Sequence, residues 1–297
     1  MTVEHQGFGH LDRAGRATAS MAERPRALVY AAVGSAVALS WLVIAAMAVR
    51  GAESRIGPAG APGDSLVSGM FHLPLPAFLE RFFALCLAPV PLGEAGVGPF
   101  LALTAMWFLM ALAMMLPSAA PMIRTYCEIA DTASRKGEAV VHPLVLVAGY
   151  LGVWLLAAIG FAGLTIALQS YRGGAAFDPA IGIAGATALG LAGLYQFSGL
   201  KEACLKKCRN PFAVLFARWT VRPAGVLRLG VEQGVWCLGC CWALMLVMFA
   251  VGVMNIFWMA LLALFTLVEK QTKGTLATRL AGAILLVWGT ALLLVSL

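Results

Sequence analysis

Long runs of apolar residues are the feature that most restricts how this chain can fold. A helix needs roughly 20 apolar residues to cross the hydrocarbon core of a bilayer, and several runs have about that length. Hydrophobic residues make up 61% of the chain and charged residues only 12%, which excludes an ordinary soluble domain. We therefore expect an all-α, polytopic membrane helix bundle with about seven transmembrane helices. The predicted spans cover residues 27–49, 100–120, 143–168, 180–198, 231–251, 253–268 and 277–296.

The polar segments divide the chain around these runs. Residues 1–26 are predicted to be a disordered cytoplasmic tail, and residues 27–297 a single membrane domain. Within that domain, residues 50–98 form an outer loop, in which the apolar stretch 77–88 is too short to span and is predicted to be an interfacial helix. Residues 123–142 are interpreted as a charged loop, and residues 199–229 are the most basic segment of the chain. Residues 99–297 carry the motifs described next.

Basic residues are distributed unevenly between the two sides of the predicted membrane. With the N-terminus inside and seven crossings, only Arg50, Arg55, Arg81 and Arg172 fall outside. Cytoplasmic loops of membrane proteins are enriched in Lys and Arg, so this arrangement predicts the N-terminus inside and the C-terminus outside. The same rule explains the net charge of +7 without a nucleic-acid partner. We expect a multi-pass protein of the bacterial inner membrane, in contact with the lipid bilayer.

The predicted fifth span combines an apolar composition with three closely spaced cysteines. Cys237, Cys240 and Cys241 fall on one face of a helix, and Met245 and Met248 continue that face. Thiolate and thioether sulfur favour Cu(I), and four thiolates also suit Zn. The alternative is that Cys and Met serve only as small and adaptable packing residues.

Two further segments bring sulfur to the same predicted depth. Met106, Met110 and Met114 repeat every four residues on the second span, and Met115 follows. The basic segment after the fourth span holds a second pair of cysteines, one helical turn apart. All three segments are predicted to meet near the cytoplasmic face. The candidate metal ligands are Cys204, Cys208, Cys237, Cys240, Cys241, Met110, Met114, Met115 and Met245.

Three motifs together resemble a known family. They are MWFLMALAMMLPSAAPM at residues 106–122, YQFSGLKEACLKKCRNP at 195–211 and GVWCLGCCWALMLVMFAVGVMNIFWM at 234–259. The chain from about residue 99 onward resembles the bacterial "predicted metal-binding integral membrane protein" family, a domain of unknown function. This resemblance implies a polytopic inner-membrane protein with a metal site. The matching positions are Met110, Met114, Met115, Pro117, Cys204, Cys208, Cys237, Cys240, Cys241, Trp242, Met254 and Asn255.

Three functions are compatible with these residues. The first is a copper-handling membrane protein that binds Cu(I) near the cytoplasmic face, for transport or for delivery to a metalloprotein. Its partner would be a copper donor or acceptor protein or a larger membrane complex. The second is a membrane thiol–disulfide oxidoreductase that uses Cys237 and Cys240, although a pair facing the reducing cytosol makes a poor disulfide donor. The third is an accessory subunit whose cysteines only pack against partner helices. No catalytic residue is assigned.

Overall fold

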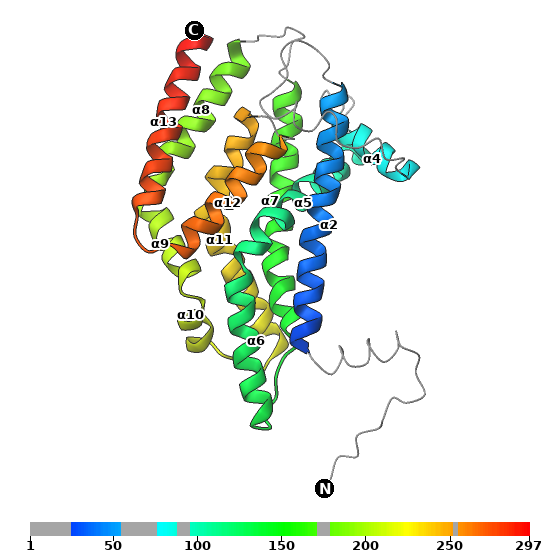
Figure 1. Ribbon diagram of the computed structural model, residues 1–297, viewed down its shortest axis with the longest axis vertical. Coiled ribbons are helices and arrows are strands. Elements are labelled where there is room, and N and C mark those ends of the chain that lie inside the picture. The colour runs from blue at the N-terminus through cyan, green and yellow to red at the C-terminus, as the bar shows by residue number, and fades with distance from the viewer. Residues whose placement is uncertain (1–24, 55–75, 88–95, 171–178, 252–254) are drawn as a thin grey trace.

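In the computed structural model, residues 25–54, 76–87, 96–170, 179–251 and 255–297 are described. Every regular element within these residues is a helix, which confirms the all-helical prediction. Most helices run along the long axis of the molecule, and the C-terminus lies at the end opposite α6 (Figure 1). The helices are α2 (Pro25–Ser54), α4 (Ala77–Leu87), α5 (Val97–Ser118), α6 (Ala120–Arg135), α7 (Pro143–Ser170), α8 (Pro179–Gln196), α9 (Gly199–Arg209), α10 (Pro211–Ala217), α11 (Pro223–Val251), α12 (Ile256–Gln271) and α13 (Leu276–Ser296).

The described helices include five that are long and apolar enough to cross a membrane: α2, α5, α7, α11 and α13. A sixth span results if α8 and α9 are one broken helix, because they are bent by 65° at a short break. Helix α12, the predicted sixth span, has 16 residues, fewer than the roughly 20 that a full crossing needs. The described chain therefore supports a multi-pass membrane protein with five or six spans. The count of seven is not confirmed, and the orientation stays a prediction.

The predicted charged loop and the basic segment that follows the fourth predicted span are both largely helical. Residues 123–142 contain most of α6, and residues 199–229 contain α9, α10 and the start of α11. In α6 the apolar side chains recur at helical spacing and are buried, among them Ile123, Tyr126 and Cys127. The hydroxyl of Tyr126 also donates a hydrogen bond of 3.0 Å to the carbonyl oxygen of Val141. The charged residues occupy the other face of an amphipathic helix, which the net polarity of the segment had concealed.

The break between α8 and α9 changes the direction of the chain by 65°. Ser198 is the N-cap of α9, and its side-chain oxygen accepts a hydrogen bond of 3.1 Å from the backbone N–H of Lys201. Serine at this position satisfies one of the free N–H groups at the start of a helix. Helix α9 then packs against α11 and α12. The break therefore brings the second pair of cysteines close to the first set.

Helices α7 and α11 cross with their backbones in contact. A Cβ atom on Gly149 would lie 2.2 Å from the carbonyl oxygen of Leu227, and one on Gly230 would lie 2.1 Å from that of Leu146. Only glycine fits at such a distance, and small residues are a common means of close helix packing in membranes. This crossing sets the position of Tyr150 on α7 relative to the cysteines of α11.

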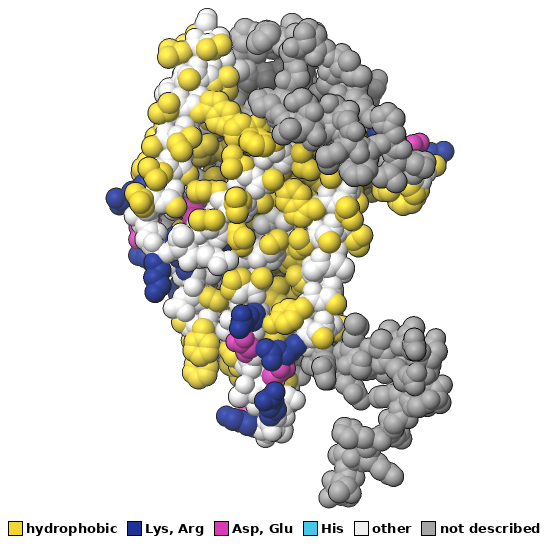
Figure 2. Space-filling view, viewed as in Figure 1, with side chains coloured by type: hydrophobic (Ala, Val, Ile, Leu, Met, Phe, Trp, Pro, Cys, Tyr) yellow, Lys and Arg dark blue, Asp and Glu magenta, His cyan; other side chains and the backbone are white. Residues whose placement is uncertain are grey.

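The interior of the bundle contains one large apolar cluster, to which α2, α5, α7, α11 and α12 contribute, and a smaller one between α8, α11 and α13. Hydrophobic side chains cover much of the face shown in Figure 2, and charged side chains gather where α6 lies and beside α9. The cysteines of α9 and α11 and the methionines of α5 and α11 belong to the large cluster. The predicted interfacial segment is helical as α4, whose Cys86 is buried and donates to the carbonyl oxygen of Ala102 at 3.4 Å.

Candidate metal centre

The three cysteines of α11 lie on the buried side of that helix. Cys240 and Cys241 are completely buried, and Cys237 is 2% exposed. The Sγ atoms of Cys240 and Cys241 are 3.3 Å apart, and the Sγ of Cys240 lies 3.1 Å from the carbonyl oxygen of Cys237. The single helical face predicted from the sequence is therefore present, and it faces the interior of the protein.

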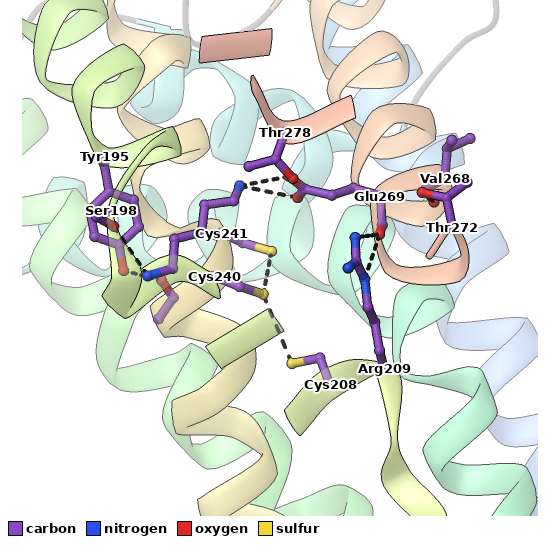
Figure 3. Close-up of polar contacts among 12 residues, drawn as sticks. Tyr195, Ser198, Cys208, Arg209, Cys240, Cys241, Val268, Glu269, Thr272 and Thr278 are labelled. Atoms are coloured by element: carbon purple, nitrogen blue, oxygen red, sulfur yellow. Dashed lines mark hydrogen bonds and ion pairs between the residues drawn. The ribbon is translucent and has the colours of Figure 1, made fainter. Parts of the chain in front are cut away.

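Helix α9 adds a fourth sulfur atom to this face. The Sγ of Cys208 is 3.9 Å from the Sγ of Cys240, although 32 residues separate them in the chain. Figure 3 shows Cys240 between Cys241 and Cys208, with the last approaching from a different helix. The predicted convergence of the two cysteine segments is thus observed for Cys208. Cys204 points to another place on α11, where its Sγ would be 2.6 Å from a Cβ atom on Gly239.

Cys237 has two polar neighbours that are also buried. The Nζ of Lys270, on α12, lies 3.0 Å from the Sγ of Cys237 and donates a hydrogen bond of 2.7 Å to the Oγ of Ser118. The hydroxyl of Tyr150 is 3.0 Å from the same sulfur and 3.1 Å from the carbonyl oxygen of Met115. Helices α5, α7, α11 and α12 therefore meet at this one sulfur atom.

A buried ion pair fixes α9 to α12. The Nζ of Lys201 lies 3.0 and 3.1 Å from the two carboxylate oxygens of Glu269, and both side chains are fully buried. Thr278, on α13, donates a third hydrogen bond of 2.8 Å to that carboxylate. Arg209, at the other end of α9, donates two hydrogen bonds to the backbone oxygen of Glu269 (Figure 3). Both ends of α9 are thus attached to Glu269 of α12, and Cys208 lies between the two attached residues.

The methionines expected to contribute ligands are buried near this centre. Met110 and Met115 are completely buried, and Met114 and Met245 are each 2% exposed. They share the large apolar cluster with the cysteines. The hydroxyl of Tyr150 contacts both the backbone oxygen of Met115 and the Sγ of Cys237. The C-terminal part of α5 therefore lies beside the thiol groups.

Two polar residues near the predicted fifth and sixth spans have structural roles. The side chain of Asn255 accepts hydrogen bonds from the backbone N–H groups of Phe257 and Trp258, so it caps α12 as expected. Glu232 forms ion pairs with Arg218 and Arg228. Met254, which belongs to the family resemblance, lies outside the described residues.

Sequence reasoning missed Lys270, Tyr150 and Ser118 as neighbours of the thiols. Each is a polar residue within or at the end of an apolar run, where a polar side chain is costly and usually faces a functional interior. This signal was available, but the sequence does not indicate which cysteine each residue contacts.

The sulfur geometry is compatible with a thiophilic ion after a small adjustment. Two sulfurs bound to one ion at about 2.3 Å, the Zn–S bond length, are at most about 4.6 Å apart. The gaps of 3.9 Å between Cys208 and Cys240 and 3.3 Å between Cys240 and Cys241 are both shorter than this limit. Among the residues that the structure describes, no three His, Cys, Asp or Glu side chains already form a metal-holding group. Binding to three sulfurs would therefore require Cys208 and Cys241 to close around a shared ion.

Comparison with known proteins gives one family. Residues 104–292 match the family model described as "PpoB2: Copper chaperone", and this range includes both cysteine segments and the methionines of α5 and α11. No curated protein and no solved structure matches the chain. Because the match covers more than half of the chain, the protein belongs to the PpoB2 family of copper chaperones.

Proposed function

We propose that this protein is a membrane-embedded Cu(I) chaperone that binds one ion at the cysteines of α9 and α11 and delivers it to a metalloprotein. The observation that carries this proposal is the contact of 3.9 Å between Cys208 and Cys240, two thiols from separate helices inside an apolar bundle. Membership of a copper chaperone family supports the choice of copper.

The ligand types favour Cu(I) over the harder cations. Thiolate and thioether donors suit Cu(I), whereas Zn in structural sites takes four thiolate or imidazole ligands in a tetrahedron. The sulfur of Cys240 is within reach of those of Cys208 and Cys241, and Cys237 is engaged by Lys270 and Tyr150. We propose a two- or three-sulfur Cu(I) site, with Zn as the competitor to be tested. Cys204 and the methionines Met110, Met114, Met115 and Met245 complete the proposed sulfur environment.

The buried ammonium group of Lys270 provides charge balance for such a site. A Cu(I) ion bound by two thiolates carries a net negative charge, which is unfavourable in an apolar interior unless it is paired. Lys270 lies 3.0 Å from Cys237 and is 8% exposed. It supplies a positive charge beside the sulfur cluster.

Delivery of the ion requires access from the surface, and Cys208 provides it. Its side chain is partly exposed, in contrast to the fully buried Cys240 and Cys241. An acceptor protein with its own sulfur ligands can exchange with Cys208 first and then draw the ion away from α11. We propose that this end of the bundle faces the cytoplasm of a bacterial cell, that the host membrane is the inner membrane, and that copper donor or acceptor proteins or a larger membrane complex dock there.

The test is a titration of the protein, purified in mild detergent under reducing conditions, with Cu(I) in competition with a chromogenic chelator. We expect about one Cu(I) per chain and loss of that binding in the Cys208→Ser, Cys240→Ser and Cys241→Ser triple variant. The matched control carries Cys86→Ser and Cys127→Ser and should bind as the wild type does. Unchanged binding in the triple variant, or tighter binding of Zn than of Cu(I), would overturn the proposal. Quinone-dependent formation of a Cys237–Cys240 disulfide would favour the oxidoreductase instead.

A further inference from the structure

Helices α5 and α11 are linked at two places, once by a direct contact between rings and once through the hydroxyl of Tyr150 on α7. Toward the start of α5, the rings of Trp107 and Phe249 are stacked with their centroids 5.1 Å apart. Toward the end of α5, the hydroxyl of Tyr150 lies within hydrogen-bonding distance of both Met115 and Cys237. The order of these contacts shows that the two helices run antiparallel.

This antiparallel register brings sulfur opposite sulfur at successive levels. Between the two contacts, α5 carries Met110 and Met114 and α11 carries Cys241 and Met245. Counting inward from both contacts puts Met114 near the level of Cys241 and Met110 near the level of Met245. Met106 and Met248 fall at the next level, beside the stacked rings. Successive levels are about 4.5–6 Å apart, the rise of three or four helical residues.

These side chains are withdrawn from the lipid-facing surface. Met106, Met110, Met114, Met245 and Met248 are all at most 2% exposed and belong to the large apolar cluster. In the part of the chain that the structure describes, every methionine is buried, whereas many leucines and valines are exposed on the outer surface of the bundle. Methionine is thus reserved for the interior. Packing alone would not require methionines on both helices at the same levels.

We propose that these methionines form a path along which Cu(I) moves between the cysteine centre and the opposite half of the membrane. The inference rests on the proposed function and extends it from holding the ion to passing it across the bilayer. Thioether sulfur binds Cu(I) without adding a negative charge, so each methionine pair holds the ion more weakly than the thiolates do. The ion exchanges one Cu–S bond for another at each level and stays Cu(I), so no electron or proton is transferred.

The stacked aromatic rings mark the end of the methionine levels. Trp107 of α5 stacks on Phe161 of α7, with their ring centroids 4.9 Å apart, and also on Phe249 of α11. The indole N–H of Trp107 donates a hydrogen bond of 2.9 Å to Thr165, which fixes the ring. Aromatic faces attract cations, so this group of rings can accept the ion where the sulfur levels end.

The test uses protein reconstituted into liposomes that contain a membrane-impermeant Cu(I) probe, with chelator-buffered Cu(I) supplied outside. The path variant carries Met106→Leu and Met248→Leu, two methionines outside the proposed binding site, which removes the sulfur but nearly preserves side-chain volume. We expect the rate of Cu(I) entry to fall at least about tenfold, while the binding stoichiometry in detergent stays at the wild-type value. The control variant carries Met47→Leu and Met122→Leu, two buried methionines on α2 and α6, and should transfer Cu(I) at the wild-type rate.

The outcomes separate this inference from the proposed function. Wild-type entry rates in the path variant, or no entry with a wild-type protein that binds Cu(I), would overturn the path alone. A wild-type protein that binds no Cu(I) in detergent would overturn both. If the double variant does not fold, the single variants Met106→Leu and Met248→Leu take its place, and each should slow entry severalfold.

Discussion

The Nζ of Lys270 lies 3.0 Å from the Sγ of Cys237, inside the bundle and between helices α11 and α12. Ser118 is the other partner of this ammonium group, at 2.7 Å. A buried positive charge is stable only beside a group that can carry or share a negative one. The pair therefore holds a positive charge next to the thiols whether or not an ion is bound.

Replacement of this lysine should weaken copper binding. A hydrogen bond to a charged group contributes about 1.5–3 kcal/mol, and each 1.4 kcal/mol is a tenfold change in affinity. We expect Lys270→Met to lower the Cu(I) affinity roughly 10- to 100-fold in a chelator competition. Lys206→Met, which removes an exposed lysine that pairs with Glu202, is the control and should leave the affinity unchanged. Equal affinities for the Lys270→Met variant and the wild type would show that the charge does not act on the site.

The two cysteines of α9 should differ in importance, although they are one turn apart in the sequence. Cys208 contacts Cys240, whereas Cys204 packs against Gly239. Cys208→Ser is expected to lower the Cu(I) affinity by more than about tenfold, equivalent to about 1.4 kcal/mol, and Cys204→Ser by much less. The same chelator competition measures both. A larger loss for Cys204→Ser would contradict the geometry.

Replacing one partner of the buried ion pair between Lys201 and Glu269 should destabilise the protein more than replacing both partners. Deleting one partner of a buried pair leaves an uncompensated charge and costs about 3–5 kcal/mol, whereas replacing both by apolar residues is often close to neutral. Lys201→Met should therefore lower the thermal unfolding temperature in detergent more than the double variant Lys201→Met/Glu269→Met does. If the double variant is the less stable of the two, leaving Glu269 unpaired carries no such penalty and the prediction is wrong.

The close crossing of α7 and α11 links stability to the site. Gly149→Ala would bring a Cβ atom to 2.2 Å from a backbone oxygen, so the helices must separate. We expect a loss of about 1–3 kcal/mol in stability and weaker Cu(I) binding, since Tyr150 moves away from Cys237. Gly152→Ala adds its Cβ where nothing lies within 4 Å and serves as the control. Both effects are measured on the same purified samples.

Thiol reactivity should distinguish the site from the other cysteines. Burial raises the pKa of Cys127 to about 11 and that of Cys86 to about 12. Because the thiolate is the reacting form, both should resist maleimide at pH 7.5, and labelling of Cys127 should rise as the pH approaches 11. Cys208 is partly exposed and should react first, with protection by Cu(I). Rapid labelling of Cys127 at neutral pH would contradict its burial.

The raised pKa of Cys127 also predicts how stability depends on pH. Since the folded state favours the thiol form, stability should decline as the pH rises from the ordinary thiol pKa toward 11.

The sequence predicted the apolar helices well because length and composition decide whether a segment can cross a bilayer. It also predicted the face shared by Cys237, Cys240 and Cys241, which depends only on helical spacing. The helical state of α6 was missed because its four charged residues hid an amphipathic pattern. The break at Ser198 was missed because its cap becomes recognisable only when the next helix leaves in another direction.

Contacts between distant segments were only partly predictable. Topology brought Cys208 toward Cys240, but the separation of Cys204 depends on the rotation of α9 about its axis, which the ion pair of Lys201 fixes. Lys270 lies at the end of an apolar run, where sequence alone indicates a membrane boundary. Its contact with Cys237 results from the packing of α12 against both α5 and α11, which no local pattern encodes.

The central claim is that thiols from α9 and α11 bind one Cu(I) ion together. X-ray absorption at the copper edge, recorded on the Cu(I)-loaded protein and on its Cys208→Ser variant, tests this most directly. The account predicts a shell of sulfur atoms alone around copper in the wild type and one sulfur fewer in the variant. A shell of nitrogen or oxygen atoms, or an identical sulfur shell in both proteins, would contradict it.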